Sequence, residues 1–382
     1  MQRIRGGVVT WPLALLLLAG TTAKASPQGE GEASEARAVR CGEVLTRNTR
    51  LTRDLSCPGA PDPALRIAAP GVVLDLGGHT VRRSGPATED SMGIVAEEGS
   101  TVRNGTVRGF NSGYVFDSGP VWLHQVALLD NQTAIYHRQG YARILLTDSR
   151  MEGNAVGMSS EFDAANGVVE VRGSRFTGNG TVLFVDDHEV SVSGSTFTSN
   201  ANVLYCFYGR VRFRSSTLAW NTSVADLAWN NSGFDNCWEL VFDNTVIANN
   251  TAFGTPEHPN WEPFDFQLRN SWVMNNGGGL NVATRTVDIR GNVWRDNAGG
   301  LTLADLPEFE PPPLVGAVRN NRFLSNDSDG LRVLPVSTPT LANNVCQGNT
   351  GWGIYAPTAI DGGGNAARGN GTGGCVGVVC AP

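Results

Sequence analysis

The sequence contains a single lysine, Lys24, among 382 residues, so almost all of its basic charge is carried by arginine. Acidic residues outnumber basic ones, and the formal net charge is −7. Nucleic-acid binding requires a basic stripe that offsets repulsion from the phosphates, and the sequence has none. We therefore expect no nucleic-acid partner. Arginine suits bidentate contact with carboxylates or sulfates.

Long apolar runs are also scarce. After the first 25 residues no stretch approaches the roughly 18 consecutive apolar residues of a transmembrane helix, so we expect no membrane span. The short run at 11–19 follows two arginines and precedes an A-x-A site at 23–25, which is typical of a signal peptide. We interpret residues 1–25 as this signal, whose removal takes the formal charge to −10. The polar segment 26–40 is expected to be a flexible acidic leader, and the protein to be secreted or periplasmic.

Seven cysteines in a chain with an export signal indicate disulfides. No CxxC pair or histidine cluster has the spacing of metal ligands, so we expect no metal site. The expected pairs are Cys41 with Cys57, which is favoured first, Cys375 with Cys380, and Cys206 with Cys237. Cys346 would then be unpaired, unless the connectivity differs.

Helical periodicity is almost absent from residue 41 onward, and a six-residue pattern recurs instead. It consists of a small polar residue, any residue, an apolar residue, any two residues and an asparagine. Nine clear copies end at Asn154, Asn179, Asn200, Asn221, Asn249, Asn276, Asn297, Asn326 and Asn349, and weaker ones at Asn111, Asn131 and Asn370. The spacing between successive copies runs from 20 to 29 residues, with 21 the most frequent. This periodicity predicts an all-β solenoid of about 12 coils.

Stacked coils lie about 4.8 Å apart, so equivalent side chains must pack on one another. The apolar residue three before each asparagine is expected to fill the interior. The asparagine is expected to turn the corner in a left-handed conformation and to bond the asparagine of the next coil. A second interior column is expected at Val115, Ile135, Met158, Leu183, Leu204, Leu280, Leu301, Leu331 and Ile354.

The repeated Asn-x-Phe-x-x-Asn followed by Gly-Leu resembles the repeats of the pectin-lyase-like superfamily, the right-handed parallel β-helices. The segments CGEVLTRNTRLTRDLSC and GVVLDLGGHTV near the start, and GNAARGNGTGGCVGVVC at the end, are similar to the terminal segments of exported bacterial β-helix repeat proteins. The resemblance implies a single-stranded right-handed parallel β-helix over 41–382, with an N-terminal cap at 41–64 and a closing segment at 364–382.

Members of this superfamily include polysaccharide lyases, glycoside hydrolases and epimerases, but their signature motifs are mostly missing here. Asp186-Asp187 matches the paired aspartates of polygalacturonases without the rest of that motif. The resemblance therefore implies a fold and leaves the reaction open.

Side chains alternate along a strand, so the residue after each interior position should face outward. One outward column is expected to read Phe116, Tyr136, Ser159, Phe184, Tyr205 and Asp226. A second, two residues further along, should read Ser118, Arg138, Glu161, Asp186 and Phe207, with His137 and His188 close by. Later coils place Asn281, Thr302 and Arg332 in the first column. Aromatic, acidic and arginine side chains on one exposed strip are typical of a sugar-binding groove.

Two inserted loops are expected to overhang this strip, at 226–240 and 251–266. Their aromatic residues could line the groove or could pack beneath the loops themselves. They are Trp229, Phe234, Trp238, Trp261 and Phe264, with His258 in the second loop.

The hypothesis is a secreted protein that binds or modifies an acidic polysaccharide along this strip. If it is an enzyme, hydrolysis would use Glu161 with Asp186 or Asp186 with Asp226. A lyase would use Arg138 with Asp186, Asp187 and a bound Ca²⁺. No other cofactor is expected. The alternative is a structural or adhesive surface protein without an active site, and a metalloenzyme accessory factor is a third possibility.

Overall fold

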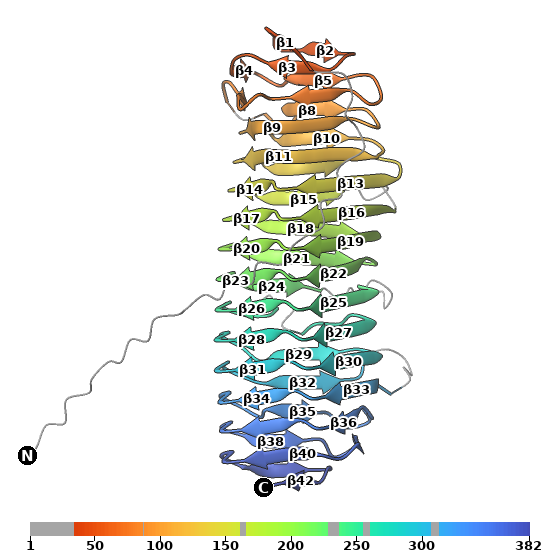
Figure 1. The fold of residues 1–382 in the computed structure, drawn as a ribbon, viewed down its shortest axis with the longest axis vertical. Coiled ribbons are helices and arrows are strands. Elements are labelled where there is room, and N and C mark those ends of the chain that lie inside the picture. The colour runs from red at the N-terminus through yellow and green to blue at the C-terminus, as the bar shows by residue number, and fades with distance from the viewer. Residues whose placement is uncertain (1–33, 87, 161–165, 228–236, 255–259, 307–312) are drawn as a thin grey trace, which may run out of the picture. The chain divides into compact units, whose positions relative to one another are not determined.

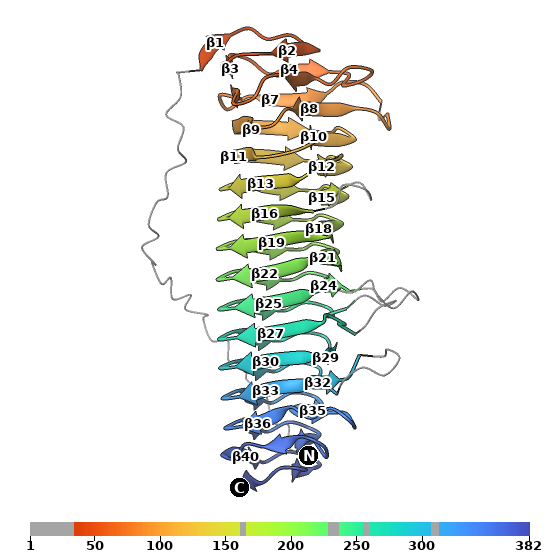
Figure 2. The same cartoon turned by 90° about the vertical axis from the view of Figure 1, so that its right-hand side faces the viewer.

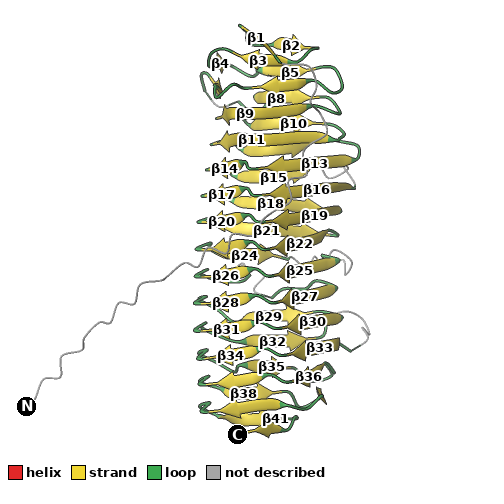
Figure 3. Cartoon of the chain, in the orientation of Figure 1, coloured by secondary structure: helices red, strands yellow, loops and turns green. Residues whose placement is uncertain are grey.

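The computed structural model describes residues 34–86, 88–160, 166–227, 237–254, 260–306 and 313–382. Every regular element among them is a β-strand (Figure 3). Residues 34–382 form one compact unit, a parallel β-helix of about 13 turns (Figure 1). This confirms the predicted fold class. The described residues contain no helix long and apolar enough to cross a membrane. The proposed signal peptide lies outside the described part of the chain.

Each full turn contributes a strand to three walls, two of which are seen side by side in Figure 2. The first wall consists of a nine-stranded and a five-stranded parallel sheet. The nine strands are β2 (Glu43–Leu45), β5 (Leu65–Ile67), β8 (Met92–Ala96), β10 (Ser112–Phe116), β12 (Thr133–His137), β15 (Val156–Ser160), β18 (Thr181–Asp186), β21 (Asn202–Phe207) and β24 (Ser223–Asp226). The five strands are β29 (Leu280–Ala283), β32 (Leu301–Ala304), β35 (Leu331–Val333), β38 (Trp352–Tyr355) and β41 (Gly373–Val376).

The second and third walls share two long strands, β9 (Thr101–Arg108) and β11 (Val121–Leu129), which run through both. The second wall also contains β1 (Glu35–Arg37), β3 (Thr49–Leu51), β6 (Val73–Asp75), β13 (Ala142–Thr147), β16 (Gly167–Arg172), β19 (His188–Ser193), β22 (Arg210–Arg214), β25 (Glu239–Asp243), β27 (Asp265–Arg269), β30 (Thr286–Arg290), β33 (Val315–Arg319), β36 (Thr340–Ala342) and β39 (Ile360–Asp361). The third contains β4 (Leu55–Cys57), β7 (Thr80–Arg83), β14 (Arg150–Glu152), β17 (Arg175–Thr177), β20 (Thr196–Thr198), β23 (Thr217–Ala219), β26 (Val246–Ala248), β28 (Trp272–Met274), β31 (Val293–Arg295), β34 (Arg322–Leu324), β37 (Val345–Gln347), β40 (Asn365–Arg368) and β42 (Cys380–Ala381).

The residue three before each asparagine fills the interior as predicted, and eight of the nine expected positions are buried. Phe176 and Phe197 stack on adjacent coils with ring centroids 4.5 Å apart. The exception is Val246, because the tandem Asn249-Asn250 fits the pattern in two registers. Asn250 is the buried one, so the interior residue of that coil is Ile247.

One asparagine from each coil contributes to a continuous hydrogen-bond ladder that runs from Asn131 to Asn370. Each side-chain oxygen accepts bonds from the backbone N–H and the amide group of the preceding asparagine, at 2.9 to 3.2 Å. The weak copy at Asn111 is not part of it, because the backbone N–H of Phe110 donates to Asn131. The prediction of stacked amides is confirmed from Asn131 onward.

The left-handed turn, by contrast, is not made by these asparagines. The residue directly before each one adopts a positive φ, for example Ser199 at 57° and Asn275 at 55°. The ladder asparagine points inward and bonds along the stack, so its neighbour makes the turn in solvent. Small or turn-forming residues occupy this position with one exception, Trp220, which has φ 61° and is 64% exposed.

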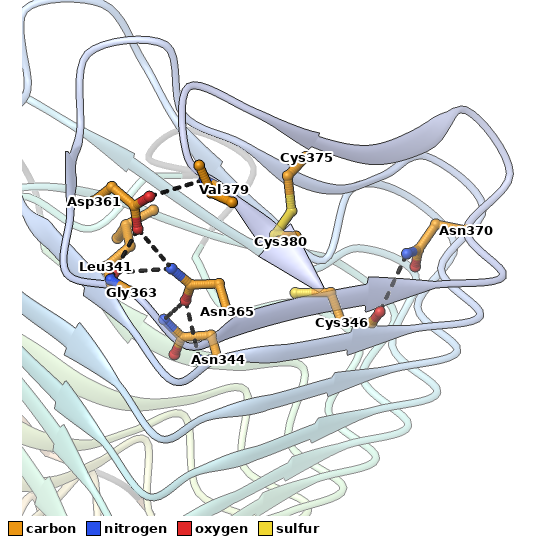
Figure 4. Close-up of a disulfide and its surroundings, with 10 residues drawn as sticks. All are labelled: Leu341, Asn344, Cys346, Asp361, Gly363, Asn365, Asn370, Cys375, Val379 and Cys380. Atoms are coloured by element: carbon orange, nitrogen blue, oxygen red, sulfur yellow. Dashed lines mark hydrogen bonds between the residues drawn. A yellow bond between two sulfur atoms is a disulfide. The ribbon is translucent and has the colours of Figure 1, made fainter. Parts of the chain in front are cut away.

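Three disulfides connect Cys41 with Cys57, Cys206 with Cys237, and Cys375 with Cys380, which confirms the expected pairing. Cys346 is free and buried. Figure 4 shows the C-terminal closure, where Asp361 accepts hydrogen bonds from the backbone of Gly363 and Val379. At the other end, β1 pairs with β3, so ordered structure begins within the segment expected to be a leader.

Candidate functional site

The first wall carries an outward column of side chains on successive coils. Strand pairing aligns Tyr136 with Ser159, Phe184 with Tyr205, and Tyr205 with Asp226. Tyr136, Phe184 and Tyr205 are partly exposed, whereas the residues before them, Ile135, Leu183 and Leu204, lie in the core. The alternation therefore sets these side chains outward, as predicted.

The prediction is wrong at β10, where the register is shifted by one residue. Tyr114 is the core residue aligned with Ile135, and Val115 is aligned with Tyr136. Phe116 is aligned with His137 and is buried, so it does not belong to the outward column. The cause is the unbroken apolar run of β10, which shows no alternation.

His137 and His188 are also buried, at 1% and 2% exposure, and do not lie on the outer surface of the strip. His137 stacks on Phe116 with ring centroids 4.9 Å apart. The His137 and His188 rings approach each other inside the wall, with centroids 5.6 Å apart. Both were expected close to the exposed strip because they lie next to its outward residues in the sequence, and the prediction that they face the ligand is wrong.

Arg138 is held by a carboxylate of the preceding coil. Its Nε donates to Asp117 Oδ1 at 2.7 Å and its Nη2 donates to Asp117 Oδ2 at 3.0 Å. Asp117, and not Ser118, therefore occupies the second column beside Arg138. Glu161, the next residue expected in this column, lies outside the described residues. Because the guanidinium fork already contacts a carboxylate, Arg138 contributes little net positive charge to the strip.

Asp186 is a carboxyl group of the strip whose pKa is shifted upward. Burial raises its pKa above the ordinary value, and the nearby charge of Asp187 raises the pKa further. Asp187 is exposed and turns the chain between β18 and β19 with φ 50°. By contrast, backbone hydrogen bonds lower the pKa of Asp54 and Asp361 near the two ends of the described solenoid. A carboxyl that holds its proton more tightly is suited to act as a general acid.

The partner carboxylate for such an acid is distant among the described residues. Asp186 is aligned with Phe207 on the next coil. Asp226 lies one coil beyond that and is aligned with Tyr205, which precedes Phe207 by two residues. Strand geometry places the Cα atoms of Asp186 and Asp226 about 12 Å apart. This separation is longer than retaining hydrolysis requires, although the two side chains share one face.

The described aromatic residues of the inserted loops mostly pack inward. Trp261 is fully buried and its Nε1–H donates to the carbonyl of Phe253 at 3.2 Å. Phe264 is 7% exposed and stacks against Trp238, with ring centroids 4.7 Å apart. Trp238 remains 41% exposed. The interpretation that these side chains pack beneath their own loops holds for Trp261 and Phe264. Trp229, Phe234 and His258 lie outside the described part.

The outward column continues in the second half of the wall, where Asn281, Thr302 and Arg332 are aligned as predicted. The next residue, Tyr355, was missed. Arg332 lies over its ring at 4.8 Å and pairs with Asp329 at 2.8 Å. The alternation pattern could have identified Tyr355, because this residue directly follows the interior residue Ile354.

Two surface hollows lie elsewhere. One of about 240 Å³ is lined by Arg82, Arg83 and Arg108 with two glycines, and one of about 200 Å³ lies beside the Cys41–Cys57 disulfide. Neither includes a residue of the outward column. The outward column runs coil by coil along the outer face of the first wall, a path that an extended ligand could follow.

The fold and the strip define the chain as a parallel β-helix with a partly aromatic outer face. No protein-family model matches the sequence, and no curated protein matches it. Among solved structures, the catalytic domain of a GH87 alpha-1,3-glucanase in complex with tetrasaccharides is similar over 87% of this chain and 63% of its own, with 12% identity and a TM-score of 0.45. The chain thus spans less than two thirds of that domain.

The A-module of the Azotobacter vinelandii mannuronan C-5 epimerase AlgE6 is similar over 89% of this chain and 91% of its own, with 13% identity and a TM-score of 0.36. At these values no residue role passes from either protein to this one.

Proposed function

We propose that this protein binds a polysaccharide along the outward column of its first wall. The observation that carries the proposal is the stack of Phe184 on Tyr205, whose ring centroids are 4.6 Å apart and whose planes differ by 7°. Both rings are partly exposed on adjacent coils. Aromatic faces offer large apolar contact area at a fixed geometry, which suits the C–H faces of sugar rings.

On the N-terminal side of this stack the next residue of the column is small. Ser159 precedes Phe184 in the column, and Tyr136 precedes Ser159. Two coil steps separate Tyr136 from Phe184, or about 10 Å. The small Ser159 side chain thus leaves a gap in the aromatic column that has room for a sugar ring against Phe184. We propose this gap as the primary sugar subsite.

The charges of the strip bear on the kind of glycan. Asp186, Asp187 and Asp226 place three carboxyl groups here, while Arg138 is paired with Asp117. An acidic glycan would therefore need a bridging cation such as Ca²⁺ to bind, whereas a neutral glycan would not. We propose that the ligand is an acidic polysaccharide that binds in the presence of Ca²⁺. Neutral glycans, which need no cation, are the control ligands.

The binding test uses Ser159→Phe, which fills the gap and continues the ring column from Tyr136 to Tyr205. Glycan microarrays followed by isothermal titration, with and without Ca²⁺, should show binding that falls at least tenfold in this variant and in Phe184→Ala. Ser191→Phe on β19 adds the same side chain outside the strip and should bind normally. Equal affinity in wild type and Ser159→Phe would refute the subsite.

Catalysis is a separate question about the same strip. A polysaccharide lyase or glycoside hydrolase acting here would use Asp186 as its acid. New reducing ends, or the ultraviolet absorbance of an unsaturated product, would report turnover that Asp186→Asn abolishes. Binding without turnover would support a binding protein. If neither occurs with any glycan, the structural or adhesive alternative is favoured.

We also propose that the protein is exported. Three disulfides are typical of chains that mature in an oxidising compartment. N-terminal sequencing of the mature protein should find a start directly after Ala25.

A further inference from the structure

Two histidines face each other inside the wall, behind the aromatic strip. His137 ends β12 and His188 begins β19, two coils further along. Their exposures are 1% and 2%, their ring centroids are 5.6 Å apart and the ring planes differ by 84°. Neither side chain has a role in the glycan site proposed above.

Each imidazole commits one nitrogen to a backbone carbonyl. His137 Nε2 donates to the carbonyl of Gln139 at 2.9 Å, and His188 Nδ1 donates to the carbonyl of Asp186. A carbonyl only accepts, so these two nitrogens carry the protons. The remaining nitrogens, His137 Nδ1 and His188 Nε2, therefore each present a lone pair.

These two lone pairs are buried and have no hydrogen-bond partner among the described residues. Ser160 Oγ is in the same condition, and Ser160 is aligned with His137 on the adjacent strand. Leaving a buried polar atom unpaired destabilises a fold, so an unpaired group of this kind calls for a ligand or a water.

The chain also keeps space open around the pair. Gly167 lies between Ala142 and His188 in the strand register of the second wall. A Cβ on Gly167 would lie 2.8 Å from Cδ2 of His188 and 2.6 Å from Cβ of Ala142, both too close. The absence of a side chain at Gly167 is therefore what lets the His188 ring occupy this position.

We propose that His137 Nδ1 and His188 Nε2 bind a divalent late transition-metal ion of the Zn²⁺ type, with Ser160 Oγ beside it as an oxygen ligand. Imidazole is the common protein ligand for such ions. Histidine ligands usually donate their second N–H to a carbonyl or carboxylate, as both rings do here. The described residues contain no cluster of three or more His, Cys, Asp or Glu, so solvent would complete the coordination.

The ring separation fits a shared ion. With a Zn–N bond of about 2.0 Å, each ring centroid would lie about 3.2 Å from the metal. Centroids 5.6 Å apart then give an angle at the metal of about 120°, within the range for three- or four-coordinate sites.

The test measures metal content in tag-free protein, since an affinity tag of histidines would bind the same ions. Wild type is first unfolded in denaturant with a chelator, which removes any bound metal. It is then refolded in the presence of Zn²⁺ and dialysed to remove the excess. We expect one Zn²⁺ per chain by plasma mass spectrometry and a visible absorption spectrum from the Co²⁺ form. His188→Phe should lose both, and His124→Phe, which changes a partly exposed histidine on β11, should lose neither.

A bridging water is the competing occupant, because one water can donate to both lone pairs. Wild type without stoichiometric Zn²⁺, or equal metal content in wild type and His188→Phe, would overturn the proposal in favour of water. If His188→Phe does not fold, His137→Phe serves, since a phenyl ring there continues the stack on Phe116. The metal content of wild type decides the question in either case.

Discussion

Replacing Asn276 by alanine tests whether the asparagine ladder stabilises the solenoid. Asn276 is 2% exposed and bonds in both directions along the stack. Its side-chain oxygen accepts from the backbone N–H and the amide of Asn250, both at 3.0 Å. Its amide donates to the carbonyl of Ile247 at 3.0 Å and to Asn297 at 2.9 Å.

The size of the effect follows from the groups left unpaired. Alanine removes the acceptor for two buried N–H groups of Asn250, and each such loss costs about 1–3 kcal/mol. We therefore expect Asn276→Ala to lower the free energy of unfolding by about 2–6 kcal/mol. The neighbouring Asn275→Gly is the control, because Asn275 is exposed with φ 55°, a conformation that glycine adopts freely.

The assay combines chemical denaturation with hydrogen exchange, since a repeat array can unfold in parts. Exchange should rise most in peptides that contain residues 245–251 and 272–277, and least in the terminal coils. The reasoning is refuted if Asn276→Ala and Asn275→Gly shift the denaturation midpoint equally.

Three further changes follow from the structure. Trp220→Asn should raise the free energy of unfolding by about 1 kcal/mol, because asparagine tolerates the left-handed conformation that costs other residues about 1–2 kcal/mol; an unchanged denaturation midpoint would contradict this. Replacing Cys206 and Cys237 together by alanine opens a loop of 31 residues and should cost about 4 kcal/mol under non-reducing conditions, and a loss below about 1 kcal/mol would be inconsistent with the loop-closure argument. Because the folded state holds the Asp186 proton more tightly than the unfolded chain does, the contribution of this carboxyl to stability falls as pH rises above about 3.9. Asp186→Asn should therefore gain stability relative to wild type between about pH 4 and pH 7 in denaturant titrations, and parallel pH profiles would show that the pKa is not raised.

The repeat could be predicted from sequence because the same physical demand recurs in every coil. An interior position such as Phe176 or Phe197 must be apolar, and the ladder position must carry an amide that both donates and accepts. These demands leave a pattern that survives insertions between coils. The cysteine pairs could be predicted because each pair is close in sequence or flanks one insertion.

The errors arose where the local pattern is ambiguous. At Asn249-Asn250 two adjacent residues satisfy the same template, and only the packing of Ile247 selects between them. In β10 three successive apolar residues show no alternation. The register with the next coil, in which Tyr114 and not Val115 is aligned with Ile135, selects the core residue. His137 faces inward because it follows the outward Tyr136 in the strand alternation, and its ring N–H donates to the carbonyl of Gln139, two residues further on.

The candidate site was only partly accessible to this reasoning. Alternation sufficed for Tyr136, Phe184 and Tyr205, which lie in a regular part of the wall. It did not show that Arg138 is paired with Asp117, because that contact joins two coils. It did place Asp226 in the column of Phe184 and Tyr205, and Asp186 two residues further along, as the strand register confirms.

The position of Cys346 has a consequence for maturation. A chain with an odd number of cysteines risks mispairing, because a free thiolate attacks existing disulfides. Cys346 is fully buried, and burial raises the pKa of its thiol far above the ordinary value. Once the coils close around it, the sulfur is both protonated and inaccessible to oxidants. Scrambling is thus confined to the interval before the C-terminal coils assemble, so early closure of that end protects the other three bridges.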